Sequence, residues 1–382
     1  MEKKILLIAL GMLFATSLVV AGYPVPALTQ PIKIGVLSSQ TGINAHPTLS
    51  DSIEVALQLY PQVAGRPIQI IHSDDASDVK TGLERAKRLV EIEKVNFLIG
   101  PRFNPVYMAI MGYTRQLPLV HMGIVSDLSY AETKEKYPHV YRISVFADMS
   151  AMLMKWLCEE RGVRKINFVV TDMAFAHVLA EAGINVLKGY PGGQVLKKIA
   201  IPMGELDMSP YVSALDKNAD ATIQWIAGQP GTIFVKTYYD FGLGKMPILR
   251  VDGAEFTWDE QLKKTPVVEG MTVIGPYAWT IDNPVNRRYV DAFKKKYGHF
   301  PDAHAGVLHD QLKVIHDVLQ ETKGDTSPDK FYQTITKMNL SLGGGSVRFS
   351  DTRYAIRDYY IFELKKVEGV LQPVMIKLLQ PK

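Results

Sequence analysis

Apolar runs of strand length alternate with amphipathic stretches along most of this chain. Residues 32–37, 95–100 and 117–122 are short apolar runs typical of buried strands, whereas residues 82–93 repeat apolar side chains at helical spacing. Strands that alternate with helices in this way form parallel sheets covered by helices on both faces. The first third of the chain therefore predicts a doubly wound α/β unit.

The same alternation starts again after a break near residues 140–148. Further strands are expected at residues 165–172, 195–202, 221–228 and 246–253, with helices between them, one of which is expected at residues 209–218. The chain of 382 residues is also too long for a single hydrophobic core. Two doubly wound lobes are therefore predicted, with a ligand cleft where the carboxyl ends of both sheets meet.

The amino-terminal segment has the pattern of an export signal. Lys3 and Lys4 precede an apolar span at residues 5–21, and small or turn-forming residues follow it. Residues 1–27 are predicted to be a signal peptide, cleaved after Ala21 or Ala27. A retained membrane anchor is the alternative, because a span of this length just crosses a bilayer. Either way, the rest of the chain is expected to be exported and periplasmic.

Composition and charge exclude several classes of protein. The chain is 47% hydrophobic and 21% charged, and its formal net charge is only +4, with both signs interspersed. No basic stripe predicts nucleic-acid binding, and the lysines at 294–296 are typical of a solvated helix face. Cys158 is the single cysteine, so no intramolecular disulfide forms. No cysteine follows the apolar span to carry a lipid, which favours a freely soluble protein.

The sequence carries no recognisable catalytic motif. It has no GxSxG, HExxH, GxxxxGK[ST] or CxxC, and its glycine runs at residues 242–247 and 343–346 do not join a strand to a helix. His304 and His309 are five residues apart, which favours structural roles over a metal pair. Asp74 and Asp75 end a predicted strand, and the following ASD is interpreted as a helix cap. No enzymatic activity, metal or cofactor is therefore expected.

The stretch LIGPRFNPVYMA, residues 98–109, has an unusual loop. Arg102, Phe103 and Asn104 follow directly on the strand predicted at residues 95–100. The carboxyl ends of strands in open α/β sheets are where ligands bind, so this loop is a candidate cleft wall. Two simpler interpretations remain open: Arg102 points to solvent, or Asn104 only caps the next helix. A helix amino terminus itself attracts anions, so capping and ligand binding are compatible.

Several segments in order resemble one known family. They include IKIGVLSSQTG, GRPIQIIHSDDASDVKTGLERAKRLV, VNFLIGP followed by LPLV, FKKKYGHFPDAHAGVLHDQLKVI and GGGSVRFSDTRYAIRDYYIFEL. Their order and spacing are similar to the type I periplasmic binding proteins of the leucine/isoleucine/valine-binding group, the receptors of ABC importers. The resemblance covers nearly all of the chain beyond the signal segment.

This resemblance implies a fold and a mechanism. The fold would be two doubly wound, Rossmann-like α/β lobes joined by a three-stranded hinge. Lobe one would comprise residues 31–145 plus 278–342, and lobe two residues 146–277 plus 343–382. The protein would close on a ligand by hinge motion and then dock to an ABC permease in the inner membrane, without making or breaking a bond.

The resemblance also implies where the pocket residues lie. Arg102, Phe103 and Asn104 stand where relatives usually place a serine that holds the ligand carboxylate. The hydroxyl position of the family matches Ser126, and its small neighbour matches Ile124. The acidic position matches Asp252, with Glu255 as a near alternative. The candidate aromatic walls of the pocket are Phe146, Trp225 and Tyr277. Alternatives remain open, since Trp225 and Tyr277 also fit a core and Asp252 also fits a turn before Gly253.

The departures from the family pattern change the expected ligand. An arginine grips a carboxylate with two parallel hydrogen bonds, and an aromatic side chain stacks on a flat ligand. The expected ligand is therefore a small organic acid, aliphatic or aromatic, with an amino acid as the rival. The expected partners are this ligand and ABC permease subunits, and the protein is expected to be a monomer. A sensor for a membrane signalling partner is the alternative function, and an exported enzyme is a third.

Overall fold

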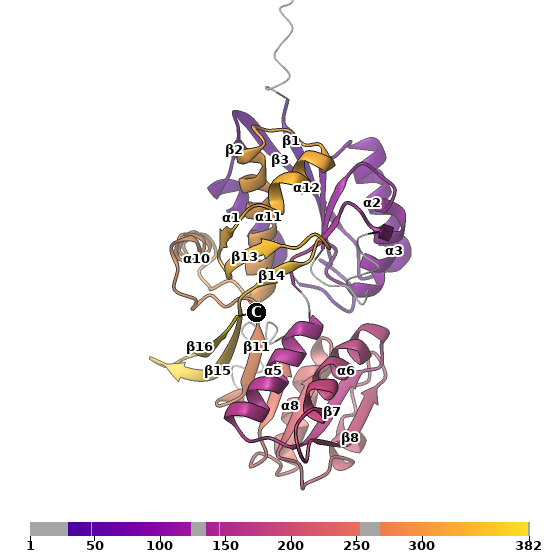
Figure 1. Ribbon diagram of the computed structural model, residues 1–382, viewed down its shortest axis with the longest axis vertical. Helices are drawn as coiled ribbons and strands as arrows, with labels where there is room; N and C mark the ends of the chain where they lie inside the picture. The colour runs from indigo at the N-terminus through magenta and orange to yellow at the C-terminus, as the bar shows by residue number, and fades with distance from the viewer. Residues whose placement is uncertain (1–29, 47, 124–134, 145, 253–267, 381–382) are drawn as a thin grey trace, which may run out of the picture.

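The computed structural model describes residues 30–46, 48–123, 135–144, 146–252 and 268–380, and Figure 1 shows two α/β lobes stacked along its long axis. The sequence-based prediction of two doubly wound lobes is therefore confirmed. The predicted signal peptide and the candidate residues Ile124, Ser126 and Glu255 lie outside the described residues. No described helix is long and apolar enough to span a membrane.

The sheet of lobe one follows from the apolar runs in the first third of the chain. Its strand order is β2-β3-β1-β4-β5-β6, and all neighbours are parallel except β2, which forms a short antiparallel hairpin with β3. The strands are β1 (Ile32–Ser38), β2 (Gln62–Val63), β3 (Arg66–Asp74), β4 (Phe97–Ile99), β5 (Val120–Gly123) and β6 (Val140–Arg142). Because β3, β1 and β4 are neighbours, the loops at their carboxyl ends lie side by side.

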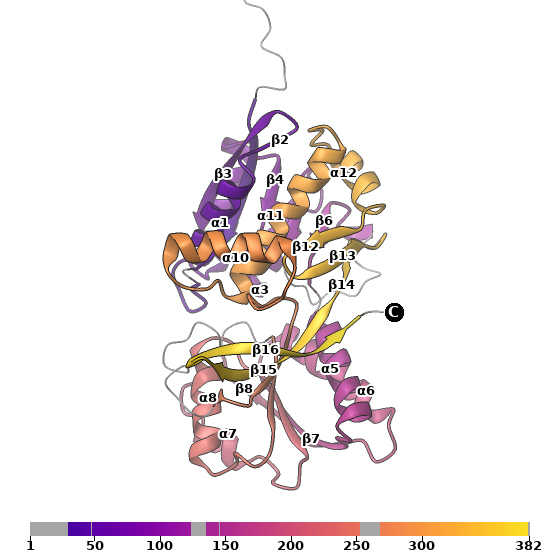
Figure 2. The ribbon, with the colours of Figure 1, turned by 90° about the vertical axis from the view of Figure 1, so that its left-hand side faces the viewer.

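Helices from two distant parts of the chain cover this sheet. The early ones are α1 (Thr48–Leu59), α2 (Val79–Lys87), the π-helical turn η2 (Arg88–Ile92) and α3 (Asn104–Thr114). The late ones are α10 (Pro284–Tyr297), α11 (Ala303–Glu321) and α12 (Pro328–Ile335), drawn in orange beside the indigo elements in Figure 2. Ser52 of α1 donates a hydrogen bond to the carbonyl of Ala305 of α11 at 2.6 Å, joining the two sets.

Lobe two has a seven-stranded sheet in the order β16-β15-β11-β10-β9-β7-β8. Its parallel strands are β7 (Lys165–Thr171), β8 (Gln194–Ile201), β9 (Ala221–Trp225), β10 (Ile248–Val251) and β11 (Thr272–Gly275). The antiparallel pair β15 (Tyr359–Val367) and β16 (Val370–Leu379) extends one edge, and the helices are α5 (Phe146–Glu160), α6 (Ala174–Lys188), α7 (Ser209–Ser213) and α8 (Gln229–Asp240).

Two helices differ from the sequence-based prediction. The predicted helix at residues 82–93 changes register after Lys87, where the N–H of Glu93 bonds to the carbonyl of Arg88. The predicted helix at residues 209–218 ends at Ser213, because the carboxylate of Asp216 accepts the N–H of Asn218 and turns the chain. Neither change alters the order of the elements.

The chain passes between the lobes three times, and Arg357, which lies at the third passage, contacts the other two. The first joins β6 to α5, the second follows β11, and the third joins β14 to β15; β14 (Ala355–Arg357) pairs with β13 (Gly345–Phe349), which pairs with β12 (Leu340–Leu342). The buried Arg357 guanidinium donates to the carbonyls of Ile143 at 3.2 Å, Pro276 at 2.9 Å and Gly344 at 3.3 Å. The lobe limits expected from the resemblance remain a prediction.

Candidate functional site

A polar cluster lies at the carboxyl edge of the lobe-one sheet. The loop after β4 carries Arg102, whose Nη2 donates to Asn44 Oδ1 at 3.0 Å and to Nε2 of His46, both in the loop after β1. Its Nη1 donates to Nε2 of His304 at 3.1 Å, at the start of α11. Arg102 is therefore fixed by two loops and a helix rather than extended into solvent.

The chemistry of these contacts fixes the protonation of both histidines. A guanidinium has only donors, so each imidazole must accept through an unprotonated Nε2. Burial lowers the pKa of His46 and of His304 well below the usual 6.5, and the nearby charge of Arg102 lowers both further. The two rings meet edge to face, with centroids 4.7 Å apart. Both are neutral at pH 7, so Arg102 supplies the positive charge of the cluster.

Two aspartates anchor the loop that carries Asn44 and His46. Asp74 accepts the N–H of Gln40 at 2.8 Å and the hydroxyl of Thr41 at 2.7 Å, and Asp75 accepts the hydroxyl of Ser39 at 2.7 Å. Burial raises the pKa of Asp75. The structural interpretation of this acidic pair is confirmed, and the ASD segment does cap a helix: Asp78 accepts the N–H of Thr81 at 2.8 Å.

Gly42 is the point where this loop approaches the β3 loop most closely. Its φ is +90°, and a Cβ there would lie 2.1 Å from the carbonyl oxygen of Ala76. We expect Gly42→Ala to displace the loop and to weaken carboxylate binding at least about tenfold, because Arg102 loses its alignment with Asn44 and His46. Calorimetry checks this, with Gly65→Ala as control, since Gly65 has φ +76° and open space around it. Equal affinities of the two variants would contradict the role given to the loop.

Asn104 is the first residue of α3, and it does not cap that helix. The residue before the helix is Phe103, and no side chain caps the first turn. Asn104 is 8% exposed, and within the described residues its Oδ1 accepts no hydrogen bond. The capping interpretation is therefore wrong, and within the described residues the buried Oδ1 of Asn104 has no partner beside the positive end of α3. Phe103 is partly buried against the core that contains Leu37 and Leu98.

Lobe two presents two of the expected residues at the carboxyl edge of its own sheet. Trp225 ends β9, is 8% exposed, packs edge-on against Phe175 at 5.1 Å, and has no hydrogen bond to its Nε1 within the described residues. Asp252 follows β10 with φ +62°, and its carbonyl accepts from Nε of the buried Arg250 at 2.9 Å. Both therefore lie at the edge where a parallel sheet binds ligands.

The two lobes approach each other beside the polar cluster. Gly228, directly before α8, has φ +62° and ψ −151°, a conformation that is essentially restricted to glycine. A Cβ on it would lie 3.6 Å from the carbonyl oxygen of Ile43 in the loop that holds Arg102. The candidate residues of lobe one and the start of α8 in lobe two thus face the same space.

The remaining aromatic candidates are placed differently. Tyr277 is 2% exposed and its ring packs over Gly306, so it lies in the core beside the second passage. Phe146 begins α5 just after the first passage. Sequence reasoning did not select Asn44 and His46, which lie further along the loop after β1 than Arg102 lies after β4. It assigned His304 only a structural role. Within the described residues, no three His, Cys, Asp or Glu side chains gather to hold a metal ion.

Comparisons with known proteins identify the family. The model of the periplasmic binding protein family matches residues 31–368. This chain belongs to that family. A Leu/Ile/Val-binding protein homolog 6 from Brucella suis biovar 1 (strain 1330) is 24% identical over 359 residues, which cover 90% of each chain. The resemblance inferred from the sequence motifs is therefore confirmed.

Solved structures of periplasmic binding proteins share the fold. A solute-binding protein of an ABC transporter from Rhodopseudomonas palustris HaA2, in complex with p-hydroxybenzoic acid, superposes with a TM-score of 0.82 at 21% identity, covering 92% of this chain and 98% of that one. A leucine-binding protein from Thermotoga maritima gives a TM-score of 0.79 at 21% identity, covering 92% and 99%. At this identity the likeness shows the fold, and the ligand must be argued from this chain's own residues.

Proposed function

We propose that this protein is a solute receptor of an ABC importer that captures a small carboxylic acid between its lobes by hinge closure. The observation that carries the proposal is the Arg102 cluster, a cation at a sheet's carboxyl edge oriented by neutral imidazoles and an amide. The positive charge of a guanidinium held in place at this edge favours an anionic ligand such as a carboxylate. Membership of the family and the acid bound to the protein from R. palustris support the same class of function.

The proposed site has complementary groups for each part of such a ligand. Arg102, the amide of Asn104 and the amino terminus of α3 would bind the carboxylate. Trp225 from lobe two would contact the apolar body, with Phe103, Phe146, Ile124 and Ser126 as further expected neighbours. Asp252 and Glu255 are the residues expected to bind the ammonium group of an amino acid, which remains the rival ligand. Tyr277 would not contact the ligand and would only pack in the core beside the second passage.

The remaining features of the proposal follow from the sequence. Residues 1–27 would direct export to the periplasm, and the lobes would divide near residues 145 and 278 and at the passage from β14 to β15. The protein would act as a monomer that binds without chemical change. Permease subunits would be its membrane partners. A solute that emerged altered from incubation with the protein would contradict the non-enzymatic role.

A thermal-shift screen tests the ligand class. A ligand that binds only the folded state stabilises it by about 2.7 kcal/mol at a hundred times its dissociation constant, so a true ligand raises the melting temperature. We expect a shift from at least one acid among p-hydroxybenzoate, benzoate and leucine. We expect none from the matching amides, which are neutral for the two benzoates and cationic for leucine. Shifts from neutral or cationic solutes alone would contradict the proposal. A shift from leucine alone would favour the amino-acid rival.

A further inference from the structure

A second cavity lies in lobe two, at the end of its sheet opposite the candidate site. It has a volume of about 490 Å³ and is lined by residues where β9, β10 and β11 begin, by the end of α5 and by Glu363 of β15. The strands are parallel, and Trp225 and Asp252 lie at their carboxyl ends, so the cavity at their amino ends is separate from the candidate cleft. Its volume is within the range of small-molecule sites.

The floor of this cavity is apolar and its main wall is aromatic. Leu157, Val163, Ala221 and Leu249 are all buried there. The indole of Trp156 is 5% exposed and is fixed by a hydrogen bond from its Nε1 to the carboxylate of Glu160 at 3.1 Å. A rigid apolar surface of this kind favours an aliphatic or aromatic ligand body.

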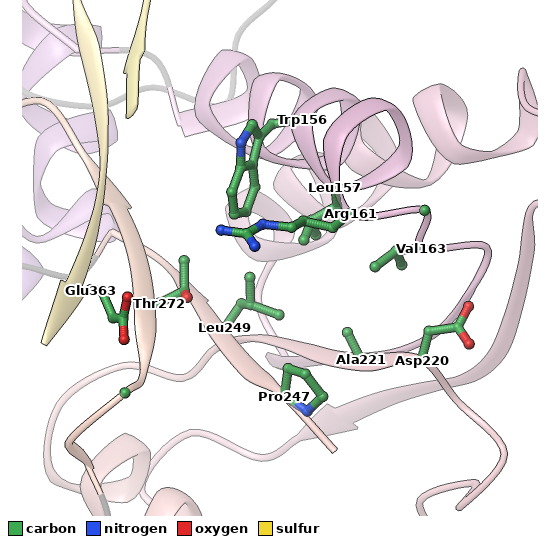
Figure 3. A pocket seen from close by; sticks show the side chains of 12 residues that line it. Trp156, Leu157, Arg161, Val163, Asp220, Ala221, Pro247, Leu249, Thr272 and Glu363 are labelled. Atoms are coloured by element: carbon green, nitrogen blue, oxygen red, sulfur yellow. The ribbon is translucent and has the colours of Figure 1, made fainter. Parts of the chain in front are cut away.

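Arg161 gives the cavity its charge preference. Figure 3 shows its side chain extended beneath Trp156, and its guanidinium carbon lies 4.9 Å from the centre of an indole ring. Stacking on an indole leaves the in-plane donors of a guanidinium available, and within the described part of the chain they make no ion pair or hydrogen bond. Arg161 is thus oriented by an aromatic ring and available to an acceptor.

The acidic residues around the cavity are already engaged. Glu363 forms an ion pair with Lys365 at 3.0 Å, and Asp220 accepts the N–H groups of Arg164 and Lys165 at 2.8 Å. Glu160, next to Arg161, is likewise paired, with Lys377 at 2.8 Å. Arg161 is the one cation among the described residues that line the cavity, so a ligand carboxylate would bind at Arg161. In Figure 3, Thr272 lies between Leu249 and Glu363 at the edge of the cavity, within reach of a polar substituent on the ligand.

We infer that this cavity is a second binding site, which takes a small amphipathic monocarboxylate with its carboxylate on Arg161 and its apolar body against Trp156 and Leu249. The inference is independent of the cleft, because it uses no residue of the Arg102 cluster.

Methyl NMR with octanoate as probe tests this inference. The methyl groups of Leu157, Val163 and Leu249 line the cavity, so we expect their signals to shift saturably with octanoate and not with octanamide. Arg161→Gln should weaken octanoate binding at least about tenfold, since a charge-assisted hydrogen-bonded pair is lost. Arg348→Gln, at an exposed position on β13, is the matched control and should leave the shifts unchanged.

The outcomes separate the two sites. Arg102→Gln should leave the octanoate shifts at Leu157, Val163 and Leu249 intact even where it abolishes binding in the cleft. The second site is refuted if these methyl signals do not move, if octanamide moves them equally, or if Arg161→Gln responds like the parent protein. The cleft is tested separately, by the affinity that Arg102→Gln loses in calorimetry.

Discussion

Replacing Arg357 with methionine should lower the free energy of unfolding by about 3–5 kcal/mol, the loss expected when one partner of a buried ion pair is removed. Arg357 and its partner Asp310 are fully buried, with Nη2 and Oδ2 3.4 Å apart. The variant also leaves the carbonyls of Ile143 and Pro276 without their guanidinium donor. Because these carbonyls belong to two different passages between the lobes, the loss should also loosen the hinge.

Denaturant unfolding measures this loss. Arg348→Met is the control, because Arg348 is exposed on the neighbouring strand, and it should change stability by no more than about 0.5 kcal/mol. Asp310→Asn combined with Arg357→Met should cost less than the sum of the single changes, because the asparagine carries no unpaired charge. If Arg357→Met and Arg348→Met had equal stability, the contacts of Arg357 with the passages between the lobes would contribute nothing to the free energy of unfolding.

Lowering the pH from about 7.5 to about 5.5 should destabilise the protein steeply. Burial lowers the pKa of His46 and His304 well below 6.5, and that of His121 to about 4. Near pH 6.5 these histidines are therefore protonated in the unfolded chain but not in the folded chain. The free energy of unfolding falls as the pH drops from 6.5 toward the histidine pKa values of the folded state. Over this range each histidine costs about 1.4 kcal/mol in total, so the three together lower the free energy of unfolding by about 4 kcal/mol.

Urea unfolding across this pH range checks the slope. His72 and His139 have lowered pKa values for the same reason and act in the same direction. Burial raises the pKa of Asp75 and of Asp302, so in more acidic solution their protonation in the folded state offsets part of the loss. His121→Gln should reduce the loss of stability by about 1.4 kcal/mol, and substitution of the exposed His299 should not change it. If the free energy of unfolding did not change between about pH 7.5 and 5.5, the buried histidines would not be held neutral in the folded state.

The sequence predicted the architecture because the period of its apolar residues is set by burial. Residues 32–37 and 165–172 have apolar side chains that pack against helices on both faces, and both runs formed parallel strands, Ile32–Ser38 and Lys165–Thr171. The end of the helix predicted at residues 209–218 was not predictable in this way. It depends on where the carboxylate of Asp216 finds a backbone N–H, which periodicity does not encode.

The candidate site was only half predictable for a related reason. Arg102 and Asn104 were found because they directly follow an apolar strand. His304 is separated from Arg102 by 202 positions, and only the packing of α11 against the first sheet brings its imidazole to the guanidinium. His46 and Asn44 follow β1 at some distance, and their role depends on a loop fixed by Asp74 and Asp75 of another strand. Contacts of this range are made by the tertiary fold and leave no local pattern.

Isothermal titration calorimetry of Arg102→Gln, with the acid that gives the largest thermal shift, shows whether Arg102 binds the ligand carboxylate. Arg115→Gln is the matched control, since Arg115 is exposed at the other end of α3. We expect the parent protein and Arg115→Gln to bind the acid with the same affinity. Arg102→Gln should bind it about 10- to 150-fold more weakly, the loss expected for hydrogen bonds to a charged group. Unchanged affinity in Arg102→Gln would show that Arg102 does not bind the ligand carboxylate.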